Sequence, residues 1–154
     1  MEVKMSREVK NKILLVEDDT DTRHVLSLLF ELEGFEVVAA ADGQEAYMRA
    51  VSEEPDLIVT DINMPKVSGL DLIRLVKEDG KLAGVPIVAM SAVEKQQLHQ
   101  ATELGAIAVY QKPIEFDQFL ALIAKLVSAR HTRSRTQPVP DVRRSVKRDR
   151  TRNH

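Results

Sequence analysis

The 154-residue sequence has no cysteine and no tryptophan, and only 4% of its residues are aromatic. Without cysteine the chain can form neither a disulfide scaffold nor a thiolate zinc site, and it has no thiol nucleophile. No apolar run approaches the roughly 18 residues that a membrane-spanning helix needs. Residues 1–11 are polar and of mixed charge, which is not typical of a secretory signal. We therefore expect a cytoplasmic protein of one domain, with no membrane partner.

Charge is distributed unevenly along the chain, although its formal net charge is only -2. Residues 128–154 contain nine Lys or Arg and two Asp, whereas residues 1–127 contain 13 basic and 22 acidic residues. The basic segment has almost no large apolar side chains, so burial cannot offset the entropy of ordering it. We expect a flexible lead-in over 1–11, a folded domain over 12–127 and a disordered basic tail over 128–154.

Five short apolar segments alternate with segments of helical periodicity inside the expected domain. The apolar segments are residues 12–16, 36–40, 56–60, 86–90 and 106–110. Runs of this length without polar alternation are typical of strands that are buried on both faces. Five strands alternating with helices predict an α/β domain with a parallel sheet covered on both sides, in one of a few doubly wound orders.

The first helical segment shows the periodicity most clearly. Val25, Leu28, Leu29 and Leu32 follow one another at i, i+3, i+4 and i+7, and Gly34 comes just after them. A glycine at this place commonly ends a helix. We expect a helix here whose apolar residues face the sheet.

Polar side chains follow four of the five expected strands. In strand order these are Glu17 and Asp18, then Asp61, Ser91 and Lys112. Because ligands of open α/β sheets bind beyond the carboxyl ends of the strands, we expect these side chains to share one site.

Clustered carboxylates repel one another unless a cation lies between them, and sites made only of oxygen favour a hard ion such as Mg²⁺. We expect Asp18 and Asp61 to bind Mg²⁺ directly, with the backbone carbonyl of Asn63 as a third ligand. Asp61 could also act as a nucleophile and form an aspartyl-phosphate. Lys112 would then neutralise charge on the transferring phosphoryl group, and Ser91 would donate a hydrogen bond to it.

Glu17, Asp18 and Asp19 could instead serve only to cap the helix that follows them, because negative charge is favoured at a helix N-terminus. We expect Asp19 or Thr20 to do this, which leaves Asp18 for the metal.

A nucleotide enzyme or a turnover phosphatase fits the sequence poorly. Neither a GxxxxGK loop nor a GxGxxG motif occurs in it. The segment Asp61-Ile62-Asn63 is similar to the DxD nucleophile motif of some phosphatases, but Asn63 stands where the second Asp supplies the acid and base.

Taken together, the motifs VEDD, DINMP, MSA and QKP resemble the receiver domain of two-component response regulators, in its stand-alone form. The resemblance covers residues 12–127 and implies a flavodoxin-like (βα)5 fold with strand order 2-1-3-4-5. It implies Asp61 as the phosphoacceptor, and an acidic pocket that Asp18 completes together with Glu17, which would contact the metal through water. Ser91 would be the switch hydroxyl, and Lys112 would contact the phosphoryl group.

Two further expectations concern the strand that ends before Lys112. The family resemblance implies a cis peptide bond between Lys112 and Pro113. Receivers commonly carry an aromatic residue three positions before the lysine, but here that residue is Val109 and the aromatic Tyr110 comes one position later. Adjacent strand residues point to opposite faces, so Tyr110 cannot simply substitute.

For partners, the resemblance implies a histidine kinase or a histidine phosphotransfer protein as phosphodonor. It also implies an unidentified output protein that binds residues 94–127, a surface through which a homodimer could also form. Such a chain would not be an enzyme in the usual sense, since it promotes only its own phosphorylation and dephosphorylation. Two alternatives remain open: a nucleic-acid-associated regulator whose basic tail makes contacts without sequence specificity, or a phosphate sink with no output partner.

Overall fold

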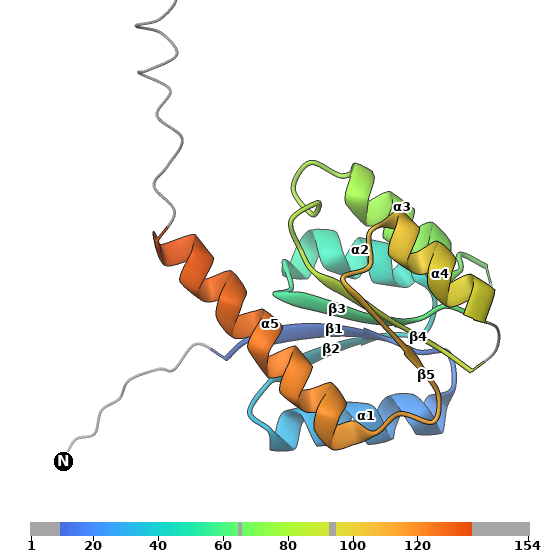
Figure 1. Cartoon of the computed structure of the whole chain (residues 1–154), viewed down its shortest axis with the longest axis horizontal. Coiled ribbons are helices and arrows are strands. Elements are labelled where there is room, and N and C mark those ends of the chain that lie inside the picture. The colour runs from blue at the N-terminus through green and yellow to red at the C-terminus, as the bar shows by residue number, and fades with distance from the viewer. Residues whose placement is uncertain (1–9, 65, 93–94, 137–154) are drawn as a thin grey trace, which may run out of the picture.

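The computed structural model describes residues 10–64, 66–92 and 95–136, in which strands and helices alternate (Figure 1). In chain order the elements are β1 (Lys12–Val16), α1 (Thr20–Leu32), β2 (Glu36–Ala40), α2 (Gly43–Glu53), β3 (Leu57–Asp61), α3 (Gly69–Glu78), β4 (Ile87–Ser91), α4 (Lys95–Leu104), β5 (Ala108–Gln111) and α5 (Phe116–Thr136). None of these helices combines the length and the apolar character that crossing a bilayer requires.

The strands form one parallel sheet in the order β2-β1-β3-β4-β5. Helices α1 and α5 cover one face, and α2, α3 and α4 cover the other (Figure 1). This is the flavodoxin-like doubly wound fold, so the predicted fold class and strand order are confirmed. From β1 the chain passes to β2 on one side and then crosses back to β3 on the other side of β1, so the strand order reverses between β1 and β3. Their carboxyl ends flank the point at which such sheets bind ligands.

The sheet separates two hydrophobic clusters. On the side of α2, α3 and α4, Ile58 packs with residues such as Leu72 and Ile73. On the side of α1 and α5, Ile13 packs with residues such as Phe30. All five residues of β3 and of β4 are buried, which explains why these strands read as continuous apolar runs.

The strand boundaries agree with the predicted ones for β1 and β2 and differ by one or two residues elsewhere. The largest shift is at β5, which begins at Ala108 instead of Ala106. The backbone N–H of Ala106 donates to the carbonyl of Ala101 in α4, after Gly105 has taken a φ of 122°. Ala106 therefore closes the preceding helix before the strand begins.

Helix α1 ends as predicted, with Gly34 in the left-handed region at a φ of 96°. Its buried face, however, is not the predicted one. Val25, Leu28 and Leu32 are 56%, 57% and 73% exposed, whereas Phe30 is fully buried. The apolar residues of this helix cover a broad arc, and the part of the arc that packs is the side from which Phe30 reaches its aromatic neighbours on α5.

Helix α5 continues to Thr136, beyond the expected domain end at residue 127. Arg130 lies in this extension and donates from Nη1 to the carbonyl oxygen of Gly84, at 2.7 Å. Residues 128–136 are therefore helical, contrary to the expected disorder. The rest of the expected basic tail, 137–154, and most of the expected lead-in, 1–9, lie outside the described residues.

Candidate functional site

The candidate site lies at the edge of the sheet where the carboxyl ends of β1, β3, β4 and β5 meet. Glu17 follows β1 and is 1% exposed; Asp61 ends β3 and is 6% exposed. Ser91 ends β4 and is fully buried, and Lys112 comes directly after β5. Buried carboxylates at the ends of two neighbouring strands are costly in free energy unless they are paired. The partners of these carboxylates therefore indicate which chemistry the site can support.

Lys112 joins the two buried carboxylates. Its Nζ donates to Oε1 of Glu17 at 2.8 Å and to Oδ2 of Asp61 at 3.2 Å. Partial burial by itself lowers the pKa of Lys112, but the hydrogen bond to Glu17 and the charges of Asp61 and Glu17 outweigh it and raise the pKa above 10.5. Lys112 therefore stays an ammonium at neutral pH.

Asp18 completes an acidic cluster with Glu17 and Asp61. One carboxylate oxygen from each residue lies within 4.8 Å of the other two, and Asp18 is exposed whereas the others are buried. Three carboxylates face a single lysine ammonium, so the cluster keeps an excess of negative charge. Oxygen-only donors with one open, solvent-facing side fit a small hard cation such as Mg²⁺, which keeps part of its water shell.

The loop after β3 holds Asp61 in position. The backbone N–H of Asn63 donates to Oδ1 of Asp61 at 3.3 Å, and that of Gly69 donates to the carbonyl of Ile62 at 2.9 Å. A Cβ on Gly69 would lie 2.2 Å from the carbonyl oxygen of Asp61. Only glycine therefore fits where α3 begins against the end of β3.

Helix α1 begins directly after the cluster. Asp19 is its N-cap, and the Asp19 carboxylate accepts from the backbone N–H of Thr22 at 2.8 Å and from its hydroxyl at 2.6 Å. These hydrogen bonds, the one from the Thr22 hydroxyl above all, lower the pKa of Asp19. Capping thus falls to Asp19, and Glu17 is free to face Lys112.

Ser91 and Lys112 are connected through their backbones. The N–H of Lys112 donates to the carbonyl of Ser91 at 2.8 Å, and the peptide bond between Lys112 and Pro113 is cis, as the family resemblance implied. Val109 packs against the cluster that α4 covers, whereas the ring of Tyr110 meets that of Phe119 edge-on at 5.0 Å on the opposite face. The aromatic side chain is therefore not on the α4 side, as the alternation along the strand predicts.

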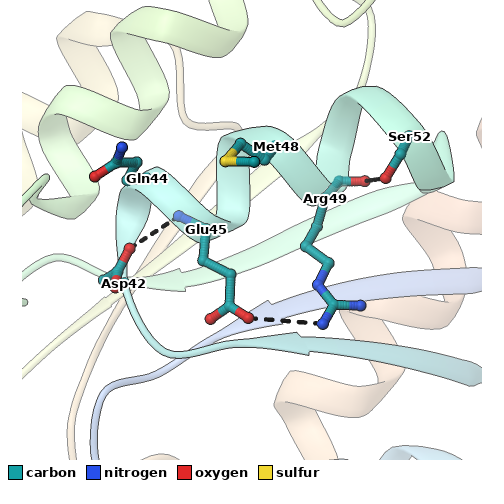
Figure 2. A pocket seen from close by; sticks show the side chains of 6 residues that line it. All are labelled: Asp42, Gln44, Glu45, Met48, Arg49 and Ser52. Atoms are coloured by element: carbon teal, nitrogen blue, oxygen red, sulfur yellow. Dashed lines mark hydrogen bonds and ion pairs between the residues drawn. The ribbon is translucent and has the colours of Figure 1, made fainter.

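Two hollows lie on the surface of the described residues, one along α2 and one beside the acidic cluster. The larger, about 580 Å³, is an open groove along α2, in which Asp42 caps the helix and Glu45 pairs with Arg49 (Figure 2). The smaller, about 410 Å³, opens beside the acidic cluster, and Asp18, Asn63 and Gln97 are among the residues that line it. Gln97 of α4 is a residue that the sequence did not single out, because neighbouring Gln96 and Gln100 look the same in a polar helix.

Comparison with known proteins gives a consistent result. The family profile described as the response regulator receiver domain matches residues 13–124. The chain is 31% identical over 112 residues to the polar-differentiation response regulator DivK of Brucella anthropi, covering 72% of this chain and 91% of the relative. It is 30% identical to the DNA-binding dual master transcriptional regulator RpaA of Synechocystis, over 75% of this chain and 48% of that protein. It is 36% identical to SilR of Salmonella typhimurium, a probable transcriptional regulatory protein, over 79% of this chain and 53% of that one. The chain thus spans about half the length of these last two relatives.

Solved structures agree with the fold. The chemotaxis protein CheY4 of Vibrio cholerae superposes with a TM-score of 0.71 at 26% identity, covering 77% of this chain and 99% of that one. The N-terminal domain of an uncharacterized protein of Wolinella succinogenes superposes with a TM-score of 0.72 at 34% identity, over 82% and 99% of the two chains.

Proposed function

This chain belongs to the response regulator receiver domain family and so serves phosphoryl-acceptance signalling, and we propose that Asp61 is the residue that accepts the phosphoryl group. The observation that supports this most directly is Lys112 Nζ between the carboxylates of Glu17 and Asp61. Asp61 is the one buried carboxylate of the acidic cluster that ends a strand, with its second oxygen turned to the backbone of the next loop. These two contacts hold the Asp61 carboxylate in one orientation.

The transfer is a substitution at phosphorus. A carboxylate oxygen of Asp61 forms the new P–O bond, while the P–N bond of a donor phosphohistidine breaks and its electron pair stays on the imidazole nitrogen, which takes a proton from water. Lys112 balances charge on the phosphoryl oxygens, and the Ser91 hydroxyl donates a hydrogen bond to one of them. The donor is a histidine kinase or a histidine phosphotransfer protein.

A divalent ion fits this chemistry. Asp18 and Asp61 would hold Mg²⁺ directly, the backbone carbonyl of Asn63 would be a third ligand and Glu17 would contact it through water. When bound, the ion neutralises charge that develops on the phosphoryl group. The chain acts only on its own phosphorylation and dephosphorylation.

Labelling by acetyl phosphate tests the assignment. With Mg²⁺ present, we expect the wild-type chain to take up one hydroxylamine-sensitive phosphoryl group and Asp61→Asn to take up none. Asp71→Asn is the matched control, because Asp71 is exposed in the first turn of α3, and it should label like the wild type. Label that persists at another residue in Asp61→Asn would refute the assignment, and full labelling in EDTA would refute the role of the ion.

The exposed stripe of α1 offers the phosphodonor a docking surface. Val25, Leu28 and Leu32 are exposed along one side of the helix, which starts beside Asp18. We expect Leu28→Asp to slow transfer from a histidine phosphotransfer protein at least tenfold, because a carboxylate would have to be desolvated in the interface. Labelling by acetyl phosphate should stay unchanged, since it needs no protein interface. If Leu28→Asp slowed phosphorylation equally with both donors, the substitution would have damaged the phosphorylation site and not the docking of the donor protein.

The phosphorylated state would reposition Ser91 and the start of α4, and so change the surface that α4, β5 and α5 form. An output protein, or a second copy of the chain, would bind there.

The basic composition of 128–154 supports a second candidate, nucleic acid as the output. Gel shifts of the chain with and without 137–154, at several salt concentrations, decide between them: binding that depends on this segment and on phosphorylation favours nucleic acid. Rapid phosphoryl uptake with no dependent binding of any kind would favour a phosphate sink.

A further inference from the structure

An arginine of α1 reaches back to the loop that carries the acidic cluster. Arg23 is the fourth residue of α1, and its Nη1 donates to the backbone carbonyl of Glu17 at 2.8 Å and to that of Asp18 at 3.4 Å. Glu17 and Asp18 supply two of the three carboxylates of the cluster. One guanidinium nitrogen thus joins α1 to the backbone from which both carboxylates project.

The loop needs such a restraint while no ion is bound, because neighbouring carboxylates repel one another. The two carboxylate oxygens of Glu17 accept from Lys112 Nζ at 2.8 Å and from the backbone N–H of Asp19 at 3.1 Å. Asp18 is exposed, so repulsion could turn its carboxylate into solvent and open the cluster. A hydrogen bond to the backbone of the same segment would oppose that movement.

We propose that Arg23 is a positioning residue that holds the backbone of Glu17 and Asp18 in place for a divalent ion. This inference rests on the proposed function, because it requires an ion at the acidic cluster. Since the guanidinium donates to carbonyls, it restrains the segment and leaves the carboxylate oxygens to the ion. The loop is then already ordered when the ion arrives, and less binding free energy is spent on ordering it.

The direction of the change in Mg²⁺ affinity separates positioning from a simple effect of charge. Arg23 carries a positive charge close to the cluster, since it contacts the backbone of two of its members. If only this charge mattered, removing it would strengthen Mg²⁺ binding, because two cations repel each other. If Arg23 orders the loop, removing it weakens Mg²⁺ binding.

Calorimetric titration of the unphosphorylated full chain with Mg²⁺ measures this direction. Loss of one hydrogen bond corresponds to about a 2- to 10-fold change in affinity, and we expect Arg23→Met to bind Mg²⁺ more weakly by this factor. Arg23→Lys keeps the charge and one donor, so its affinity should lie between those of Arg23→Met and the wild type. Arg49→Met is the matched control, because Arg49 is exposed on α2 and pairs there with Glu45. It should bind Mg²⁺ as the wild type does.

Hydrogen exchange in EDTA tests whether the ion-free loop itself loosens. The backbone N–H of Asp19 donates to Glu17, so its exchange rate reports how well this segment is ordered. In Arg23→Met the exchange of Asp19 should become several-fold faster. The exchange of Val59, in the buried strand β3, should change by a smaller factor, because the rest of the domain stays folded.

Labelling by acetyl phosphate separates positioning from direct contact with the phosphoryl group. At saturating Mg²⁺ we expect Arg23→Met to label at the wild-type rate, since the bound ion then orders the loop. A rate that stayed low at saturating Mg²⁺ would overturn the proposal, as would Mg²⁺ binding by Arg23→Met that equalled or exceeded that of Arg49→Met. Asp18→Asn in the same titration keeps the two ideas distinct: its loss of binding would uphold the ion site even if Arg23 proved irrelevant. A wild-type chain that bound no Mg²⁺ at millimolar concentration would overturn both.

Discussion

Replacing Lys112 by methionine removes the ammonium from between Glu17 and Asp61 and leaves a side chain of similar length. The side chains of Glu17 and Asp61 are only 1% and 9% exposed, whereas that of Lys112 is 24% exposed. Removing one partner of a fully buried ion pair costs about 3–5 kcal/mol. Because water reaches the lysine, we expect Lys112→Met to lower the free energy of unfolding by a smaller amount, about 2–3 kcal/mol.

Urea denaturation in the presence of EDTA measures this loss. Lys125→Met is the matched control, since Lys125 is exposed on α5, and it should change stability by less than about 0.5 kcal/mol. Adding Mg²⁺ should then restore more stability to Lys112→Met than it adds to the wild type, because the cluster without its ammonium attracts a cation more strongly. Ligand binding at ten times its dissociation constant stabilises by about 1.4 kcal/mol.

The sign of the pH dependence follows from the raised pKa of Lys112. A group whose pKa is higher in the folded state stabilises fully below its unfolded pKa, here 10.5, and loses that effect as pH rises through the folded value. The gap between wild type and Lys112→Met should therefore be constant near neutral pH and narrow above pH 10.5. A variant as stable as Lys125→Met at pH 7, or one that Mg²⁺ stabilises no more than the wild type, would refute the reasoning.

Two further predictions concern the loops around the site. Gly69→Ala should lower stability by about 1–3 kcal/mol in urea denaturation, because the new methyl group collides with the backbone at the end of β3. Gly80→Ala has open space around its Cβ, and a loss as large there would contradict this explanation. Asp19→Ala should lower the melting temperature at pH 6, because the lowered pKa of Asp19 means that its capping stabilises above about pH 3.8 and is lost as pH falls further. The difference from wild type should therefore shrink toward pH 2.5, and a difference that grew in acid would exclude the cap as its cause.

Much of the fold could be predicted because a parallel sheet imposes its pattern on the sequence. Strands such as β3 are buried on both faces, so apolar runs mark them directly. Polar residues at the ends of those runs, Asp61 and Lys112 among them, then had to share an edge once all strands ran the same way. The sequence therefore placed the carboxylates and the lysine together without any knowledge of side-chain geometry.

The predictions failed for features that depend on packing between segments far apart in the sequence. In α1 the apolar residues cover a broad arc of the helix, so periodicity could not show that Phe30 packs inward and Leu28 outward. The part of α5 beyond residue 127 contains Arg130, which reaches the carbonyl of Gly84, a contact between residues far apart in the sequence. Gln97 has the same chemistry as its neighbours, and only its place beside the hollow distinguishes it.

The polypeptide supplies its own counter-ion to the acidic cluster. Folding should therefore not require the metal, although in many metalloproteins both folding and reactivity do. A zinc finger unfolds when a chelator strips its metal. Here Lys112 already pairs with both buried carboxylates, so we expect the domain to stay folded when magnesium is scarce and to lose only its reactivity. The magnesium concentration would then control phosphorylation without changing the amount of folded protein. A cell short of magnesium would keep the protein folded but unphosphorylated, and it could respond as soon as the ion returns, without new synthesis.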